Sequence, residues 1–409
     1  MQKYLTLLLI LLIVSCKDNP EKLKIGNYRA TLKVNDTLNL PFNFEVTAPK
    51  SIKIFNAEEV ILVNEITYAN DSVIIQMPVF DAYLKAKIEG DMLKGFYVKE
   101  DLNRVVDFEA EFGNSERFAR SERVSKYTVE GNWETVFSPN SEEDKYIAKG
   151  IFKQDGNKVT GTFRTTTGDY RYLEGVINAN KLSLSTFDGA HAFLFTATVT
   201  DSTMEGMFYS GAHWKEPFIA KRNDTFELPD ANDLTYLKEG YEALEFSFSD
   251  ASGAMVSLAD EQFKDKVVVV QIMGSWCPNC LDESKFYSEY YKNNQDKDIA
   301  FVALAFEYAK TEEKAFNSIK RLQNDVGIEY PILLAQYGTS NKTKAQEKLP
   351  MLNHVLSYPT SIFIDKKGAV RKIHTGFNGP ATGEKYIEFK TEFESFVNEL
   401  LAEDIKIIL

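Results

Sequence analysis

The chain has 409 residues, which exceeds what one hydrophobic core ordinarily holds, so two or three domains are expected. Hydrophobic residues make up 44% of the chain and aromatic residues 13%, a composition that argues against disorder. The formal net charge is -13 and no basic patch stands out, which argues against nucleic acid as a partner.

The chain starts with one lysine, Lys3, and an apolar run from Leu5 to Val14. This run is shorter than the roughly 20 apolar residues that span a bilayer, so it fits the apolar region of a secretory signal. The segment Ile13-Val14-Ser15-Cys16 resembles the lipobox of bacterial lipoproteins. That resemblance implies that residues 1–16 are a lipoprotein signal peptide and that Cys16 carries lipid. The alternative is an ordinary signal peptide with a chance cysteine.

A lipid on Cys16 places the rest of the chain outside the cytoplasm, anchored in a bacterial cell envelope, with residues 17–24 as a short tether. Lys17 follows this cysteine, where aspartate is the inner-membrane retention signal of enteric bacteria, so the outer membrane is favoured over the inner. Lipidation also leaves only two thiols, Cys277 and Cys280, with no third thiol to scramble with them.

Residues 25–222 show short alternating strands separated by Gly, Asn and Asp, which predicts an all-β region of antiparallel strands. The region is also repeated, because Gly26-Asn27-Tyr28 recurs as Gly131-Asn132-Trp133 and three weaker matches follow in the same order. We therefore predict two tandem β units, residues 25–120 and 127–222, each a barrel or a sandwich. Neither carries a catalytic constellation, so a binding or spacer module and a dimerisation or anchoring scaffold both stay open.

Residues 223–241 are polar and acidic, and we predict a linker with one short helix at residues 231–238. The remaining residues, 242–409, alternate apolar runs with amphipathic segments, which indicates an α/β domain. The fold class is therefore multidomain, with an all-β N-terminal region followed by an α/β domain.

The α/β domain contains two cysteines at the point where a strand gives way to a helix. The run Val267–Met273 is apolar at all but one position, which predicts a strand buried in a sheet covered on both faces. Gly274 ends this strand, and Pro278 fits the first turn of a helix. Cys277 is then at or next to the N-cap, where the positive end of the helix dipole favours a thiolate. We predict a redox pair, with Cys277 as exposed nucleophile and Cys280 as resolving thiol.

The order Trp276-Cys277-x-x-Cys280-x-x-Glu283 after a hydrophobic strand resembles the active site of TlpA-like and ResA-like thiol-disulfide oxidoreductases of the thioredoxin superfamily. The resemblance covers residues 244–401 and includes Tyr358-Pro359-Thr360, where that family carries a cis-proline opposite the site. It implies a thioredoxin fold for residues 242–409. It also implies a reductase of protein disulfides that receives electrons from a membrane donor.

The sequence departs from the family pattern at two positions, and these departures leave the redox potential of the cysteine pair open. The residues between the cysteines are Pro278-Asn279, whereas many relatives place proline second, and Lys285 stands where a proline is common. The residues to which the resemblance and the pattern assign roles in the reaction are Cys277, Cys280, Glu283, Pro359 and Trp276.

Glu283 is predicted to handle the proton of the dithiol. Thioredoxin itself has a buried aspartate at the position that Gln271 occupies here, and an amide cannot titrate. Cys280, Glu283 and Tyr287 share one helical face, so Glu283 is expected to be partly buried beside the second sulfur with a raised pKa. The alternative is a surface glutamate that stabilises the helix start.

Other site chemistries fit less well. Structural zinc needs two more ligands, but the third cysteine is Cys16 and the four histidines lack ligand spacing, so no metal and no cofactor are expected. A thioredoxin-fold thiol peroxidase would place its cysteine in a P-x-x-x-[ST]-x-x-C pattern, which neither Cys277 nor Cys280 matches. A binding lipoprotein with an accessory redox module is the third alternative.

Overall fold

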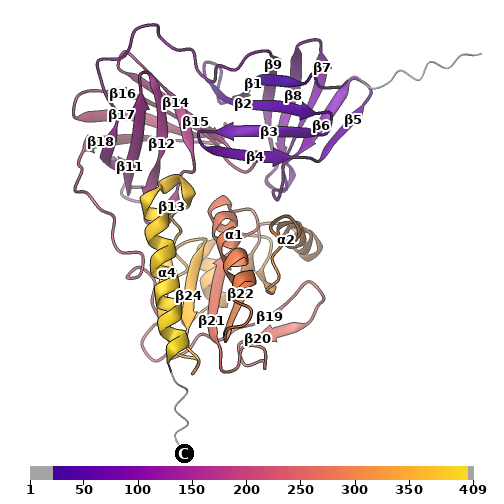
Figure 1. The fold of residues 1–409 in the computed structure, drawn as a ribbon, viewed down its shortest axis with the longest axis vertical. Helices are drawn as coiled ribbons and strands as arrows, with labels where there is room; N and C mark the ends of the chain where they lie inside the picture. The colour runs from indigo at the N-terminus through magenta and orange to yellow at the C-terminus, as the bar shows by residue number, and fades with distance from the viewer. Residues whose placement is uncertain (1–21, 404–409) are drawn as a thin grey trace, which may run out of the picture.

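The computed structural model describes residues 22–403, which form three sheets in chain order (Figure 1). The predicted signal peptide and the predicted lipidation site at Cys16 lie outside the described residues. Among the helices of residues 22–403, none is both long and apolar enough to cross a membrane. The two N-terminal sheets lie side by side, and the α/β domain packs below them in the view of Figure 1.

The first β unit is one antiparallel sheet of nine strands. Its strands are β1 (Gly26–Lys33), β2 (Asn39–Ala48), β3 (Ser51–Asn56), β4 (Glu59–Val63), β5 (Ile66–Ala69), β6 (Ser72–Gln76), β7 (Tyr83–Glu89), β8 (Met92–Lys99) and β9 (Arg104–Phe112), with the 3₁₀ turn η1 (Glu100–Leu102) before β9. Alternate side chains are buried, as in β1, where Tyr28, Ala30 and Leu32 face the core. The sheet stays open, because β4 and β5 are its two edges.

The second β unit also has nine strands, but its sheet closes on itself. They are β10 (Gly131–Phe137), β11 (Tyr146–Asp155), β12 (Lys158–Thr165), β13 (Gly168–Asp169), β14 (Leu173–Asn178), β15 (Lys181–Phe187), β16 (Ala192–Val199), β17 (Thr203–Ser210) and β18 (Trp214–Arg222). Strand β11 pairs with both β10 and β12, which makes a barrel. Its core is a separate aromatic cluster around Trp133, Phe137 and Phe163.

The prediction of an all-β N-terminal region is confirmed. In each unit the first strand pairs with both the second and the last strand, which agrees with the repeat seen in the sequence. The two-residue strand β13 in the second unit pairs only with β12.

Residues 223–241 do not contain the predicted helix. Their backbone groups pair instead with the α/β domain: the Lys238 amide donates to the Met351 carbonyl, and the Thr375 amide donates to the Ala231 carbonyl. Leu237 forms an isolated bridge with Leu352. The segment is therefore docked on the α/β domain, because those partners satisfy the groups that a helix would have paired internally.

The α/β domain has the predicted thioredoxin fold around a seven-stranded sheet in the order β20-β19-β23-β22-β21-β24-β25. The strands are β19 (Ser247–Ser249), β20 (Met255–Ser257), β21 (Val267–Met273), β22 (Ile299–Phe306), β23 (Ile332–Gln336), β24 (Thr360–Ile364) and β25 (Val370–Thr375). The helices are α1 (Pro278–Asn293), α2 (Glu312–Val326), α3 (Lys342–Lys348), the 3₁₀ turn η2 (Pro380–Thr382) and α4 (Glu384–Ala402). Central strand β21 is buried at every position.

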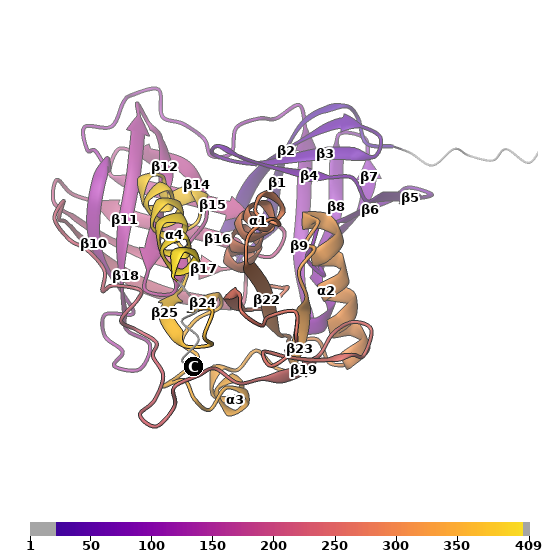
Figure 2. The same ribbon diagram turned by 60° about the horizontal axis from the view of Figure 1, so that its bottom comes forward.

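The buried side chains of the first β unit and of the α/β domain belong to one continuous cluster. Phe187, at the end of β15 in the second unit, joins it and stacks on Phe42 with 4.2 Å between ring centroids. In Figure 2, α1 lies between the two β units. All three parts of the molecule therefore meet near the start of α1, which is where the two cysteines lie.

Candidate active site at the start of helix α1

Cys277 is the N-cap residue of α1, as the sequence predicts. Its backbone is extended, with φ -99° and ψ 113°, and Pro278 occupies the first helical turn. The Cys277 sulfur accepts the backbone N–H of Cys280 at 3.2 Å, which satisfies one of the unpaired amides of the helix start. Gly274 is required just before it, because a Cβ there would lie 2.3 Å from the Trp276 indole nitrogen.

Both cysteines are free and buried. Cys277 is 6% exposed and Cys280 is fully buried, so the prediction of an exposed nucleophile is wrong for this arrangement of the domains, although the order of exposure is as expected. The Cys277 thiol donates to the Tyr358 carbonyl at 3.4 Å. Burial, and then the adjacent Cys277, raise the pKa of Cys280 well above its ordinary value. Cys280 therefore needs a base before it can act as a nucleophile.

Trp276 and the loop at Pro359 both lie near the first cysteine, and the Trp276 ring lies 5.6 Å from that of Tyr358. The Tyr358–Pro359 peptide bond is cis, as the family resemblance implies. The Trp276 indole N–H donates to the Phe306 carbonyl at 2.9 Å, and its ring lies 5.5 Å from that of Tyr308. These contacts fix the indole as a wall next to the nucleophile.

Glu283 lies on the inward face of α1 and is completely buried. One carboxylate oxygen accepts from Gln271 Nε2 at 2.8 Å, and the other accepts from the Ser361 and Tyr287 hydroxyls at 2.9 and 3.3 Å. Burial raises the pKa of Glu283 to about 7, although the three hydrogen bonds oppose that shift. Its charge in turn contributes to the raised pKa of Cys280. A carboxyl group able to exchange a proton near neutral pH thus lies beside the second thiol.

Glu307 is a second buried carboxyl group that the sequence analysis missed. It follows β22 directly, and its two oxygens accept from the Ser275 amide at 2.7 Å and from the Ser275 hydroxyl at 2.8 Å. Burial raises the pKa of Glu307 to about 7. The signal was available, since β21 and β22 are parallel neighbours that pair Met273 with Ala305, so the residues after each strand meet at one edge.

The hairpin between β12 and β13 covers one side of the site. The Ser357 hydroxyl donates to the Thr167 carbonyl at 2.8 Å, and the Asn279 side-chain amide donates to the Asp169 carbonyl at 3.1 Å. Gly168, with φ +145°, allows this approach, because a Cβ there would lie 2.2 Å from the Asn279 amide nitrogen. These contacts explain the small exposure of Cys277, and nothing local in the sequence announces them.

A buried arginine joins all three parts of the chain beside the site. Arg171, in the second β unit, pairs with Glu59 of the first unit at 2.6 Å and with Asp188 at 3.5 Å. It also pairs with Asp282 of α1. Asp169 adds a contact of its own, since its carboxylate accepts the Gly379 amide at 2.7 Å. The start of α1 is thus fixed against the β units by an ion cluster excluded from solvent.

The fold and the Cys-x-x-Cys pair define a thioredoxin-fold thiol-disulfide oxidoreductase. Residues 238–387 match the Redoxin family. The thioredoxin-like protein YneN of Bacillus subtilis is 30% identical over 140 residues, which are 34% of this chain and 73% of that protein. The thiol-disulfide oxidoreductase ResA of Bacillus thuringiensis subsp. konkukian is 28% identical over 150 residues, which are 37% of this chain and 75% of ResA.

Among solved structures, a thiol:disulfide interchange protein of the thioredoxin family from Chlorobium tepidum matches 40% of this chain and 99% of its own. Its sequence identity is 21% and its TM-score 0.31. By its sequence similarity to YneN and ResA, the chain belongs to their thioredoxin-like family. The Redoxin match begins after both β units.

Proposed function

We propose that the chain is a membrane-anchored, extracytoplasmic reductase of protein disulfides that acts through Cys277 and Cys280. The observation that supports this most directly is the unequal environment of the two thiols. Cys277 caps a helix and accepts a backbone N–H, whereas Cys280 is fully buried and has a raised pKa. This difference suits an attacking thiol and a resolving thiol.

In the first half of the reaction, the Cys277 thiolate attacks one sulfur of the substrate disulfide. A new bond forms between Cys277 and that sulfur, and the substrate S–S bond breaks. The other substrate sulfur leaves with the bonding electron pair and takes a proton from water. Trp276 and Pro359 position the substrate chain against Cys277.

In the second half, Cys280 transfers its proton to Glu283 and attacks the Cys277 sulfur. The mixed disulfide breaks, the second substrate sulfur leaves as a thiolate, and a Cys277–Cys280 disulfide remains. The substrate gains two electrons and the pair loses two. Glu283 suits this proton transfer because burial raises its pKa to about 7, near the operating range of a general base. A membrane electron donor then reduces the pair again.

The proposed location follows from the lipobox-like segment. Cys16 is the proposed lipid attachment site, with the outer membrane favoured over the inner one. A Cys16→Ser variant is expected to accumulate as uncleaved precursor without lipid label. Unchanged incorporation of labelled fatty acid would reject the anchor while leaving the redox chemistry in place.

Trapping tests the roles of the cysteines. A Cys280→Ser variant should accumulate mixed disulfides with its substrates, because the resolving step is blocked, whereas a Cys277→Ser variant should accumulate none. Non-reducing gels followed by mass spectrometry identify the trapped proteins. Mixed disulfides on Cys280 in place of Cys277 would reverse the assignment.

A further inference from the structure

A cavity of about 320 Å³ lies where both β units meet the active-site loop. The first unit contributes Lys99 and Arg104, the second contributes His213, and the α/β domain contributes Trp276 and Tyr308. Trp276 directly precedes Cys277, so the cavity adjoins the active-site loop. We call it the basic cavity. Its size is that of a small-ligand site, large enough for a few side chains and too small for a folded domain.

The basic cavity has a concentration of positive charge. Lys99 and Arg104 are opposite each other in register on β8 and β9. Lys99 Nζ donates to the Ala190 carbonyl at 3.0 Å, and within residues 22–403 neither Lys99 nor Arg104 forms a salt bridge. Asp188, whose charge acts on Lys99, is itself paired with Arg171 and His191.

The pKa values of the lining groups agree with this uncompensated charge. Burial, and then the nearby Arg104, lower the pKa of Lys99 to about 8. Burial, Arg104 and Lys99 together lower the pKa of His213 to about 4. Lys99 and Arg104 are partly buried and, among the described residues, have no salt-bridge partner, so they lose part of their hydration, and an anion in the cavity would offset that cost.

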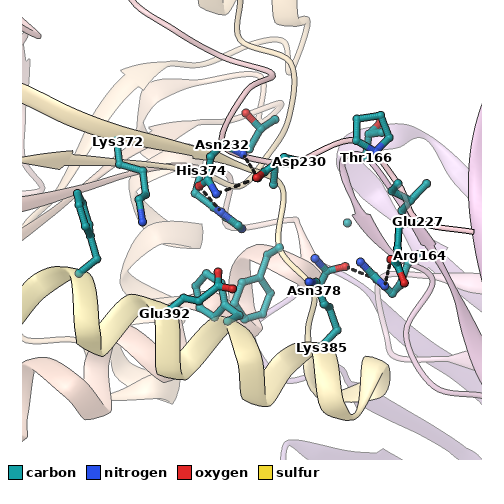
Figure 3. Close-up of a pocket in the computed structure, with 18 of the residues that line it drawn as sticks. Arg164, Thr166, Glu227, Asp230, Asn232, Lys372, His374, Asn378, Lys385 and Glu392 are labelled. Atoms are coloured by element: carbon teal, nitrogen blue, oxygen red, sulfur yellow. Dashed lines mark hydrogen bonds and ion pairs between the residues drawn. The ribbon is translucent and has the colours of Figure 1, made fainter. Parts of the chain in front are cut away.

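The larger cavity in the molecule, of about 740 Å³, differs in this respect (Figure 3). There Arg164 pairs with Glu227 at 3.6 Å and donates to Asn378 at 3.0 Å. Acidic and basic side chains alternate along its wall, and it contains no residue of the Cys-x-x-Cys motif. Only the basic cavity, of these two, combines unpaired positive charge with a wall that adjoins Cys277.

The two sides of the active site differ in what covers them. On one side of the site, the β12–β13 hairpin contacts Asn279 and Ser357. Trp276 lies on the side of the basic cavity. Of the two sides, the one that carries Trp276 is therefore the side on which a cavity adjoins the active-site loop.

We propose that the basic cavity binds carboxylate groups next to the disulfide of the substrate, so that the protein selects acidic disulfides. This inference rests on the proposed function, because it names the substrate class of the same site. Lys99 and Arg104 supply the charge, and Trp276 lines the path from the cavity to the sulfur.

Paired small disulfides test this selection. Dithiobis(nitrobenzoate) carries a carboxylate on each half, whereas dithiodipyridine carries none. In a Lys99→Gln/Arg104→Gln variant, kcat/KM for the acidic compound should fall at least about tenfold, the factor expected for one lost charge-assisted contact. The value for the neutral compound should stay within about twofold, since only the acidic compound makes that contact.

A matched control separates the cavity from the overall charge of the protein. Lys85→Gln/Lys87→Gln removes the same two charges from exposed positions on β7. It should leave both rates unchanged. Equal losses for the acidic and neutral compounds, or equal losses in the control, would overturn the proposal.

Binding without chemistry distinguishes this proposal from the proposed function. The chain has three cysteines, so a variant with serine at Cys16, Cys277 and Cys280 has no thiol and cannot react with dithiobis(nitrobenzoate). Calorimetry should show saturable binding of that compound, lost when Lys99→Gln/Arg104→Gln is added. Binding with no disulfide reduction by the parent would reject the proposed function alone, and reduction with no charge preference would reject the cavity alone.

Disulfide-linked peptides distinguish two sources of the carboxylate. One peptide has glutamates beside its cysteines, and the other has glutamines. Preference for the acidic peptide, lost in Lys99→Gln/Arg104→Gln, supports acidic protein segments. Preference confined to the small compound assigns the cavity to small acidic disulfides, and no preference for either acid rejects the proposal.

Discussion

Two adjacent carboxyl groups on α1 have opposite surroundings. Asp282 faces the β units and pairs with the Arg171 guanidinium, with Lys285 at 3.9 Å. Glu283 faces inward, and all its hydrogen-bond partners are uncharged. A cation holds a carboxylate in its charged form and makes it a structural group, whereas neutral donors in a buried site leave it able to take up a proton. One step along the helix thus separates a domain contact from a proton acceptor.

The largest effect is expected from removing the ion pairs that Arg171 makes with Asp282 and its neighbours. Arg171→Met removes the guanidinium from buried Asp188 and Asp282 and from partly buried Glu59, so the free energy of unfolding should fall by about 3–5 kcal/mol. Urea titration measures this loss. Exposed Arg120 gives the control, and Arg120→Met should unfold like the parent. A parent-like midpoint for Arg171→Met would show that the ion cluster does not hold the domains together.

The buried carboxyl groups Glu283 and Glu307 should make the stability of the protein depend on pH. The pKa of Glu283 and of Glu307 is about 7 in the folded protein, against an ordinary value of 4.5. Between these values the folded state keeps a proton that the unfolded state has lost, so stability falls as pH rises from about 4.5 to about 7. This loss of stability, up to about 3 kcal/mol for each group, is complete above pH 7 and absent below pH 4.5.

Urea unfolding across that range measures the slope. Glu283→Gln and Glu307→Gln should each remove the part of this slope that comes from the replaced carboxyl group, because an amide does not titrate. Glu289→Gln, at an exposed position of α1, should keep the slope of the parent. Identical slopes in all four proteins would mean that folding does not shift the pKa of either buried carboxyl group.

Glu283→Gln should also slow the reaction, by about 10²-fold, the lower end for loss of a general base. The pH–rate profile should lose its limb near pH 7, while alkylation of Cys277 stays at the parent rate. Stopped-flow reduction of a disulfide measures both effects, with Glu289→Gln as control. If the profiles of variant and parent superimpose, Glu283 does not transfer the proton.

The smallest effect is expected at Glu307, which acts on the loop before Cys277 and not on the sulfur. Its carboxylate orients Ser275 through two hydrogen bonds, and Glu307→Gln keeps an acceptor for only one of them. We expect the rate to fall about fivefold, as for one lost hydrogen bond of about 1 kcal/mol. Glu307→Asp, which restores the charge, should recover part of the loss. A parent-like rate for Glu307→Gln would exclude this positioning role.

Local chemistry made part of the site predictable. The strand end at Gly274 and the cap at Cys277 are encoded within a few residues of each position, whereas the cis bond before Pro359 was implied by the family resemblance. Helical periodicity placed Glu283 on the buried face, and its raised pKa agrees with that prediction. These features depend on backbone geometry and on one amphipathic helix, which a sequence pattern can express.

The failures share a different cause. Cys277 was expected to be exposed, but the β12–β13 hairpin, distant along the chain, contacts Asn279 within the motif and Ser357 in the loop before Pro359. The pairs that Arg171 makes with Glu59 and Asp282 join three parts of the chain. Residues 231–238 have helical composition, but their backbone bonds to the α/β domain. Sequence periodicity describes one element at a time, so it does not report on packing between domains.

The contact between Asn279 and the Asp169 carbonyl has a thermodynamic consequence. Asn279 lies between the two cysteines, and its partner belongs to the second β unit. If docking of that unit changes the reduction potential of the pair, oxidation must change the docking equilibrium by the same free energy, because the two events share one thermodynamic cycle. The oxidation state of the two sulfur atoms and the docking of the β barrel are then linked through one coupled equilibrium.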